Sequence, residues 1–149
     1  MRKLVLAGLL TLGLSNNAHA EAIGIGGFLG EPTGLDIKLD LQRRSALDIV
    51  LGVTTFRDGH VSYGHLTYLY TLGVAHGQSA RIPFRIGLGG ALFGVTESST
   101  GLAARVPFEM AIRFRRSPLE IYGEVTFVLQ LIDTVEPNVD GGIGLRVYF

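Results

Sequence analysis

The stretch Gly141-Gly-Ile-Gly-Leu-Arg-Val-Tyr-Phe149 decides the fold. Counting back from Phe149, every second residue is large and apolar, whereas the residues between them are Tyr, Arg and Gly. Successive side chains of a β-strand point to opposite faces, so this alternation is typical of a strand with one apolar and one polar side. Because soluble domains usually end in a frayed polar tail, a strand that runs to Phe149 leads us to expect that this residue is embedded.

The same alternation recurs in seven further segments that are separated by turn-forming residues. These segments cover residues 22–28, 35–41, 47–53, 63–72, 82–92, 102–114 and 119–131. The clearest is 35–41, where four aliphatic residues alternate with Asp36, Lys38 and Asp40. The 21 glycines also weigh against helices. We therefore predict an all-β fold, an eight-stranded antiparallel up-and-down transmembrane β-barrel with both termini at one end.

The charges of the connecting segments support this strand count. The even-numbered connections are basic and the odd-numbered ones are mainly acidic, although Arg57 lies in an odd one. The basic residues are Arg43, Arg44, Arg115 and Arg116, and the acidic ones are Glu31, Asp58, Glu97, Asp133 and Glu136. Odd and even connections of an up-and-down barrel emerge at opposite ends, so the alternation predicts one basic and one acidic end.

The first twenty residues are typical of a secretory signal peptide. Arg2 and Lys3 precede the apolar run 4–14, and Ala18-His19-Ala20 supplies a small-x-small cleavage pattern. Cleavage after Ala20 would leave residues 21–149 as one barrel domain located in the cell outer membrane. With Arg2 and Lys3 removed, 11 basic and 13 acidic side chains remain, a net charge of −2. This balance argues against a nucleic-acid partner.

The sequence offers no pattern for a cofactor or a metal ion. Cysteine is absent, which excludes disulfides and cysteine-based metal sites. No metal-ligand spacing or phosphate loop occurs, and the Gly-rich segment at residues 24–27 is not followed by the helix that dinucleotide binding requires. We therefore expect no cofactor and no metal.

Alternation alone does not say which face lies inside. A soluble periplasmic barrel with an apolar ligand pocket would show the same alternation but with its apolar face inside, and this barrel stays an alternative. The polar face, however, carries many glycines, which a narrow lumen needs, and charges of nearly balanced sign. Both features favour the membrane barrel. In lipid an unpaired strand edge costs several kcal/mol per polar group, so the sheet must close.

Twelve charged residues of the polar face would then line the interior as a packed network of ion pairs. They are Asp36, Lys38, Asp40, Asp48, Arg85, Arg105, Glu109, Arg113, Glu120, Glu124, Asp140 and Arg146. An eight-stranded barrel is just wide enough for side chains to fill it, so we predict a lumen without a pore. A narrow channel for ions or protons is the alternative, because such networks also occur on transport paths.

His60 and Ser62 are the only candidates for catalysis. An imidazole beside a hydroxyl is the minimum for an activated nucleophile. The pair resembles the His-x-Ser motif of lipid A deacylases, which are small barrels whose catalytic residues face the outer leaflet. The Asn that follows the Ser in that family is Tyr63 here, and no orienting carboxylate is evident. We therefore predict that the protein is not an enzyme, with a lipid-modifying enzyme as the alternative.

The last strand resembles the C-terminal signal of bacterial outer-membrane barrels, carried by Gly144, Val147 and Phe149. This resemblance implies the barrel-assembly machinery as a partner during insertion. Nearly the whole of residues 21–149 also resembles a family of small outer-membrane barrel proteins of Gram-negative and spirochaetal bacteria. The resembling segments are Gly30-Glu-Pro-Thr-Gly-Leu35, Ala46-Leu-Asp48, Tyr68-Leu69, Arg105-Val-Pro107, Pro118-Leu-Glu-Ile121 with Glu124, and Gly142-Ile-Gly-Leu-Arg146 through Phe149.

This family resemblance implies an eight-stranded barrel similar to the membrane domain of the major outer-membrane protein A class, and no established activity. The chain departs from the family at Thr67, which stands at a position that is often acidic. We therefore predict a structural or envelope-integrity role for a monomer in contact with outer-membrane lipid and lipopolysaccharide.

Overall fold

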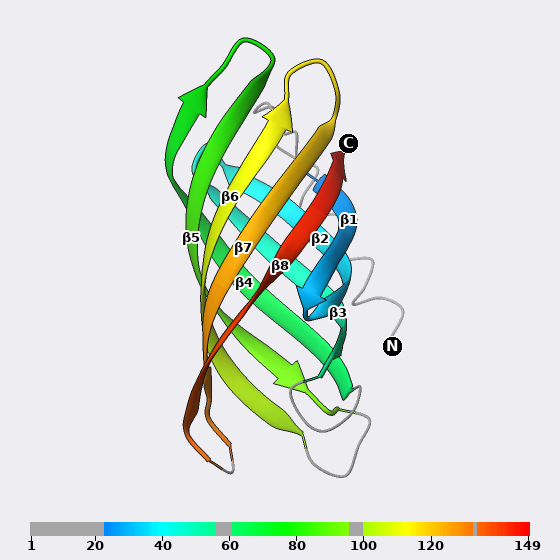
Figure 1. Cartoon of the computed structure of the whole chain (residues 1–149), viewed down its shortest axis with the longest axis vertical. Coiled ribbons are helices and arrows are strands. Elements are labelled where there is room, and N and C mark those ends of the chain that lie inside the picture. The colour runs from blue at the N-terminus through cyan, green and yellow to red at the C-terminus, as the bar shows by residue number, and fades with distance from the viewer. Residues whose placement is uncertain (1–22, 56–60, 96–99, 133) are drawn as a thin grey trace, which may run out of the picture.

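The computed structural model describes residues 23–55, 61–95, 100–132 and 134–149, which form a closed barrel of eight strands (Figure 1). Each strand pairs antiparallel with its neighbour in the chain, and β1 pairs with β8. The strands are β1 (Ile23–Glu31), β2 (Thr33–Gln42), β3 (Ser45–Thr54), β4 (Val61–His76), β5 (Ala80–Phe93), β6 (Gly101–Phe114), β7 (Leu119–Gln130) and β8 (Glu136–Tyr148). The predicted all-β, eight-stranded antiparallel up-and-down fold is confirmed. The signal-peptide prediction for residues 1–20 lies outside the described residues.

Closure leaves β1 with a hydrogen-bonded partner on both sides. Ile25, for example, lies opposite Ile37 of β2 and opposite Val147 of β8. The backbone N–H of Phe149 donates to the carbonyl of Ile23 at 2.9 Å, so the pairing continues to the last residue. No strand edge remains open in the barrel, and this satisfies the polar backbone groups of every strand within the sheet.

Several strands are longer than the sequence prediction, and β4, for example, runs from Val61 to His76 and not over residues 63–72 only. The β8 strand begins at Glu136, although Pro137 and Asn138 favour a turn, because β7 is long enough to pair with it up to Gln130 opposite Glu136. The connection between β1 and β2 is also shorter than predicted, since only Pro32 separates the two strands. Residues 136–140 therefore belong to the barrel wall and not to the preceding loop.

The outer surface of the barrel is apolar and its interior is polar. Large apolar side chains are exposed on all eight strands, with Leu88 at 66% and Phe127 at 56%. Asp36, Glu120 and Arg146, which belong to the alternate positions, are fully buried. This sidedness is the reverse of a soluble barrel that binds an apolar ligand inside. No helix in the described part of the chain is long and apolar enough to cross a membrane.

Two inward-facing glycines make room for tyrosine rings that lie across the neighbouring strand. A Cβ atom added at Gly144 would lie 2.2 Å from the ring of Tyr122, its cross-strand partner. A Cβ at Gly24 would lie 3.0 Å from the ring of Tyr148. The absent side chains let both rings lie flat against the wall, and their hydroxyl groups reach the charged centre.

We predict that Gly144→Ala destabilises the barrel by about 1–3 kcal/mol, because the new methyl group overlaps the Tyr122 ring. Urea titration of the refolded protein, read from gel mobility, measures this loss. Gly90→Ala is the matched control, since the nearest atom to a Cβ there is the carbonyl oxygen of Ala103 at 3.8 Å. Equal stabilities of the Gly144 and Gly90 variants would contradict the packing argument.

Candidate functional site: the charged interior

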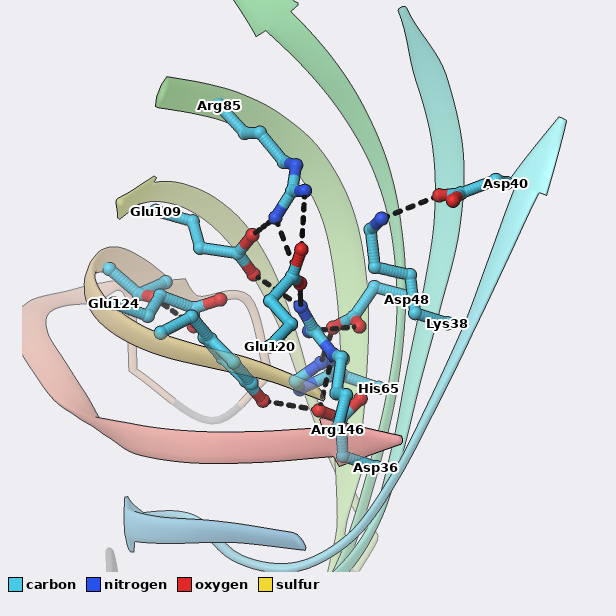
Figure 2. A network of polar contacts seen from close by, with 12 residues as sticks. Asp36, Lys38, Asp40, Asp48, His65, Arg85, Glu109, Glu120, Glu124 and Arg146 are labelled. Atoms are coloured by element: carbon cyan, nitrogen blue, oxygen red, sulfur yellow. Dashed lines mark hydrogen bonds and ion pairs between the residues drawn. The ribbon is translucent and has the colours of Figure 1, made fainter. Parts of the chain in front are cut away.

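The guanidinium of Arg146 lies at the centre of the interior charge network (Figure 2). Its Nε donates to Asp36 at 2.7 Å and its Nη2 to Asp48 at 2.7 Å. Its Nη1 donates to Glu109 at 3.0 Å and to Glu120 at 3.1 Å. The face of the guanidinium also lies 3.6 Å from the centroid of the Tyr122 ring. One cation therefore holds four carboxylates from four different strands.

The contact between Arg146 and Asp36 depends on a glycine between them. Gly26 of β1 is the cross-strand partner of Asp36 on one side and of Arg146 on the other. Because Gly26 has no side chain, Arg146 reaches across β1 to β2. Tyr122 donates a hydrogen bond from its hydroxyl to the same Asp36 carboxylate. The strands β2 and β8 both pair with β1 in the sheet. Although they are far apart in the sequence, they are therefore also joined by side chains inside the barrel.

Arg85 adds a second cation that shares two of these carboxylates. It donates to Glu109, its cross-strand neighbour, and it contacts Glu120 through two bonds of 2.9 and 3.2 Å. Tyr148 donates from its hydroxyl to Glu120 at 3.1 Å. Glu120 therefore accepts hydrogen bonds from Arg85, Arg146 and Tyr148. Such multiple pairing compensates the cost of removing a carboxylate from water.

The cluster continues toward the end of the barrel at which β1 begins and β8 ends. Lys38 donates from Nζ to Asp40 at 2.5 Å and to the hydroxyl of Tyr148 at 3.1 Å. Arg113 lies 3.5 Å from the other oxygen of Asp40 and stacks 3.7 Å from the Tyr148 ring centroid. Asp40 and Arg113 are half-buried, so this end of the network is partly open to solvent.

A third group lies on the other side of Arg146. Arg105 donates to Glu124, to Thr126 at 3.1 Å and to Nδ1 of His65. The opposite ring nitrogen of His65 lies 3.2 Å from Asp48. Because Nδ1 accepts from Arg105, the ring proton of a neutral His65 lies on Nε2 and points to Asp48. His65 therefore links this group to the central carboxylates.

The remaining candidate residues that the structure describes lie outside the charge network. Asp140 is half-buried in β8 opposite Thr126, and within the described residues it makes no hydrogen bond or ion pair. Gly144 faces the interior, whereas Phe149 is 78% exposed. Ser62 lies half-buried at the start of β4, opposite Val53. His60 lies outside the described residues, so the structure gives no geometry for a His60–Ser62 pair.

Sequence reasoning did not assign the polar aromatic residues that complete the network. Tyr122 and Tyr148 occupy inward positions, bond carboxylates and cover the guanidinium groups of Arg146 and Arg113. Both tyrosines stand at the positions of the alternating pattern that belong to the polar face, and this predicts that they point inward. Alternation does not show, however, that a glycine on the neighbouring strand leaves room for each ring. Within the described ranges, no group of His, Asp and Glu side chains could hold a metal ion.

These observations define a class of protein: a closed eight-stranded antiparallel β-barrel with an apolar outer wall and a charge-filled interior. A scan against protein-family models and a search of curated protein sequences found no match. Among solved structures, the chain is similar to the crystal structure of the N-terminal β-barrel domain of Pseudomonas aeruginosa OprF. The TM-score is 0.61 at 17% sequence identity, over 87% of this chain and 98% of that domain. This likeness confirms the eight-stranded outer-membrane-type barrel fold that the sequence resemblance implied.

We predict that Arg146→Gln destabilises the barrel by roughly 3–5 kcal/mol, because it leaves four carboxylates at the centre without their common cation. Urea titration of the refolded protein measures the loss, and Arg116→Gln, an exposed arginine in a turn, is the control. Adding Glu120→Gln to Arg146→Gln should restore part of the stability, since it removes one of the repelling charges. Additive losses in the double variant would contradict a coupled network.

Proposed function

We propose that this protein is a small integral outer-membrane β-barrel that contributes to the structure and integrity of the cell envelope. The observation that carries the proposal is the apolar outer wall around all eight strands, combined with the burial of the charges inside. The shortest strand, β1, has 9 residues and the longest, β4, has 16. A tilted strand of about 9–11 residues is sufficient to cross the hydrocarbon layer.

The connections support an orientation in that membrane. At the end where β1 begins and β8 ends, only residues 43–44, 77–79 and 115–118 separate the strands. At the opposite end three of the four connections, at 55–60, 94–100 and 131–135, are longer, whereas the fourth is Pro32 alone. Bacterial outer-membrane barrels have short periplasmic turns and longer extracellular loops. We therefore place the basic turns with Arg43, Arg44, Arg115 and Arg116 on the periplasmic side.

The filled interior supports a structural role over a channel. Arg146, Glu120 and Asp36 are fully buried, and Arg146 bonds both carboxylates inside the barrel (Figure 2). A path for ions past this layer would require several of its ion pairs to open at once. We propose a non-conducting monomer surrounded by outer-membrane lipid and lipopolysaccharide, inserted by the barrel-assembly machinery, which would read Gly144, Val147 and Phe149.

We predict that the protein is recovered in the outer-membrane fraction and that its gel mobility changes on boiling. Closed membrane barrels keep their hydrogen-bonded sheet in detergent until they are heated, so the folded and unfolded forms migrate differently. The measurement compares boiled and unboiled samples of the fractionated cells. Recovery as a soluble periplasmic protein without such a shift would contradict the proposed location.

A matched pair of variants tests the lipid contact directly in refolded protein. Leu88→Arg places a charge in the middle of β5 on the exposed apolar face and should cost roughly 2–4 kcal/mol of unfolding free energy. Val95→Arg is the control, because Val95 is similarly exposed but lies beyond the end of β5 and should cost about 0–1 kcal/mol. Equal costs would mean that the exposed face is not in lipid.

We further propose that the barrel has no enzymatic activity. Because His60 and Ser62 are the only catalytic candidates of the sequence, substitution of Ser62 tests this proposal. Mass spectrometry of lipid A is expected to give the same spectrum from cells that produce the wild-type protein, the Ser62→Ala variant or neither. Both proteins should be present in the outer membrane at equal amounts. A deacylated lipid A species that depends on the wild-type protein and disappears with Ser62→Ala would establish a lipid-modifying enzyme instead.

A further inference from the structure

A cavity of about 590 Å³ lies at the end of the barrel at which β1 begins and β8 ends, next to the central charge cluster. Its wall comes from the ends of β2, β4 and β6, the beginnings of β3 and β5, and the turn between β2 and β3. Six basic side chains line it: Lys38, Arg43, Arg44, Arg81, Arg85 and Arg113. The main-chain N–H of Thr71 donates to the carbonyl of Arg44 at 2.7 Å and holds the β2–β3 turn against β4.

The charges of this cavity do not balance. Asp40 is the only carboxylate among the described residues that line it. Both of its oxygens are engaged, by Lys38 at 2.5 Å and by Arg113 at 3.5 Å. The carboxylates that hold Arg85, namely Glu109 and Glu120, lie deeper in the central cluster. The residues that line the cavity therefore carry a net positive charge, to which Arg43 and Arg44 of the β2–β3 turn contribute.

The inner end of the cavity also offers a preorganised donor. Lys38 is 2% exposed, and its ammonium group has three hydrogens to donate. Asp40 and the hydroxyl of Tyr148 accept two of them. Among the described residues no acceptor bonds the third, which can point into the cavity that Lys38 lines. The hydroxyl-bearing residues Ser45 and Thr71 line the same space and add neutral donors.

We propose that this cavity is a binding site for a phosphate-type oxyanion, either inorganic phosphate or a phosphoester. Guanidinium groups match the geometry of phosphate oxygens, and a buried ammonium supplies a strong charge-assisted hydrogen bond. The cavity is larger than a single phosphate needs and lies within the roughly 300–1,000 Å³ typical of ligand pockets, so it has room for an ester substituent. This binding site goes beyond a purely structural role of the barrel.

Isothermal titration of sodium pyrophosphate into the refolded full chain tests this site, at low ionic strength in a non-ionic detergent. We expect saturable binding with one site per chain. The double variant Arg43→Gln/Arg44→Gln should weaken it at least about tenfold, since two charge-assisted contacts are lost. Arg115→Gln/Arg116→Gln removes the same charge at the same end but does not line the cavity, and should change the affinity less than about threefold.

Absence of saturable binding by the wild-type protein would overturn the site, and so would equal weakening in the two double variants, because equal weakening indicates general charge attraction. The heat-dependent gel shift shows that each variant is folded. If Arg43→Gln/Arg44→Gln does not fold, Arg44→Gln alone serves as a second variant of the cavity wall and should weaken binding by several-fold.

The same titration in lipid nanodiscs distinguishes the two sources of the phosphate group. If the affinity for pyrophosphate is the same in phosphatidylcholine and in phosphatidylglycerol discs, the site takes a soluble phosphate compound. If phosphatidylglycerol competes and weakens pyrophosphate binding in the wild type but not in the Arg43→Gln/Arg44→Gln background, the site takes the headgroup of an anionic lipid. Each result supports a phosphate site and assigns its ligand.

Discussion

Burial of the Arg146 guanidinium is the constraint on which the rest of this barrel depends. A charge in the interior is tolerated only when its hydrogen bonds and its charge are matched. The matching carboxylates belong to β2, β3, β6 and β7, and Arg85 of β5 shares two of them. Six of the eight strands therefore meet in one cluster. The sheet must close, and Gly26 must lack a side chain, for β2 and β8 to take part.

This centre replaces the apolar core of a soluble domain. Most large apolar side chains face outward, and in the described part of the chain the two clusters of buried apolar residues are small; one packs Phe28 and Ala111 around Tyr122. Hydrophobic burial consequently depends on what surrounds the barrel, whereas the interior is specified by pairing and shape. The inward glycines contribute to that shape, because the rings of Tyr122 and Tyr148 occupy the volume that side chains at Gly144 and Gly24 would need.

The fold followed from the sequence because alternation with period two records which residues share a face. It does not record strand tilt or register, and these decide the contacts inside. Lys38 lies directly opposite Asp48 across the sheet, yet its ammonium bonds Asp40 on its own strand, while Asp48 bonds Arg146. The start of β8 was missed for a related reason, since Glu136, Pro137 and Asn138 have turn propensities that pairing with β7 overrides.

The pairing of charges also distinguishes the part of the barrel that can bind an ionic ligand from the part that cannot. At the centre each carboxylate oxygen of Glu109 already accepts from an arginine, so these oxygens are engaged and a new anion would meet repulsion. At the end where β1 begins and β8 ends, Asp40 is the one carboxylate among the described residues that line an open volume with several basic side chains. Recognition of an outside ion needs an unmatched charge together with space. The basic cavity combines both with donors that the closed interior holds in position.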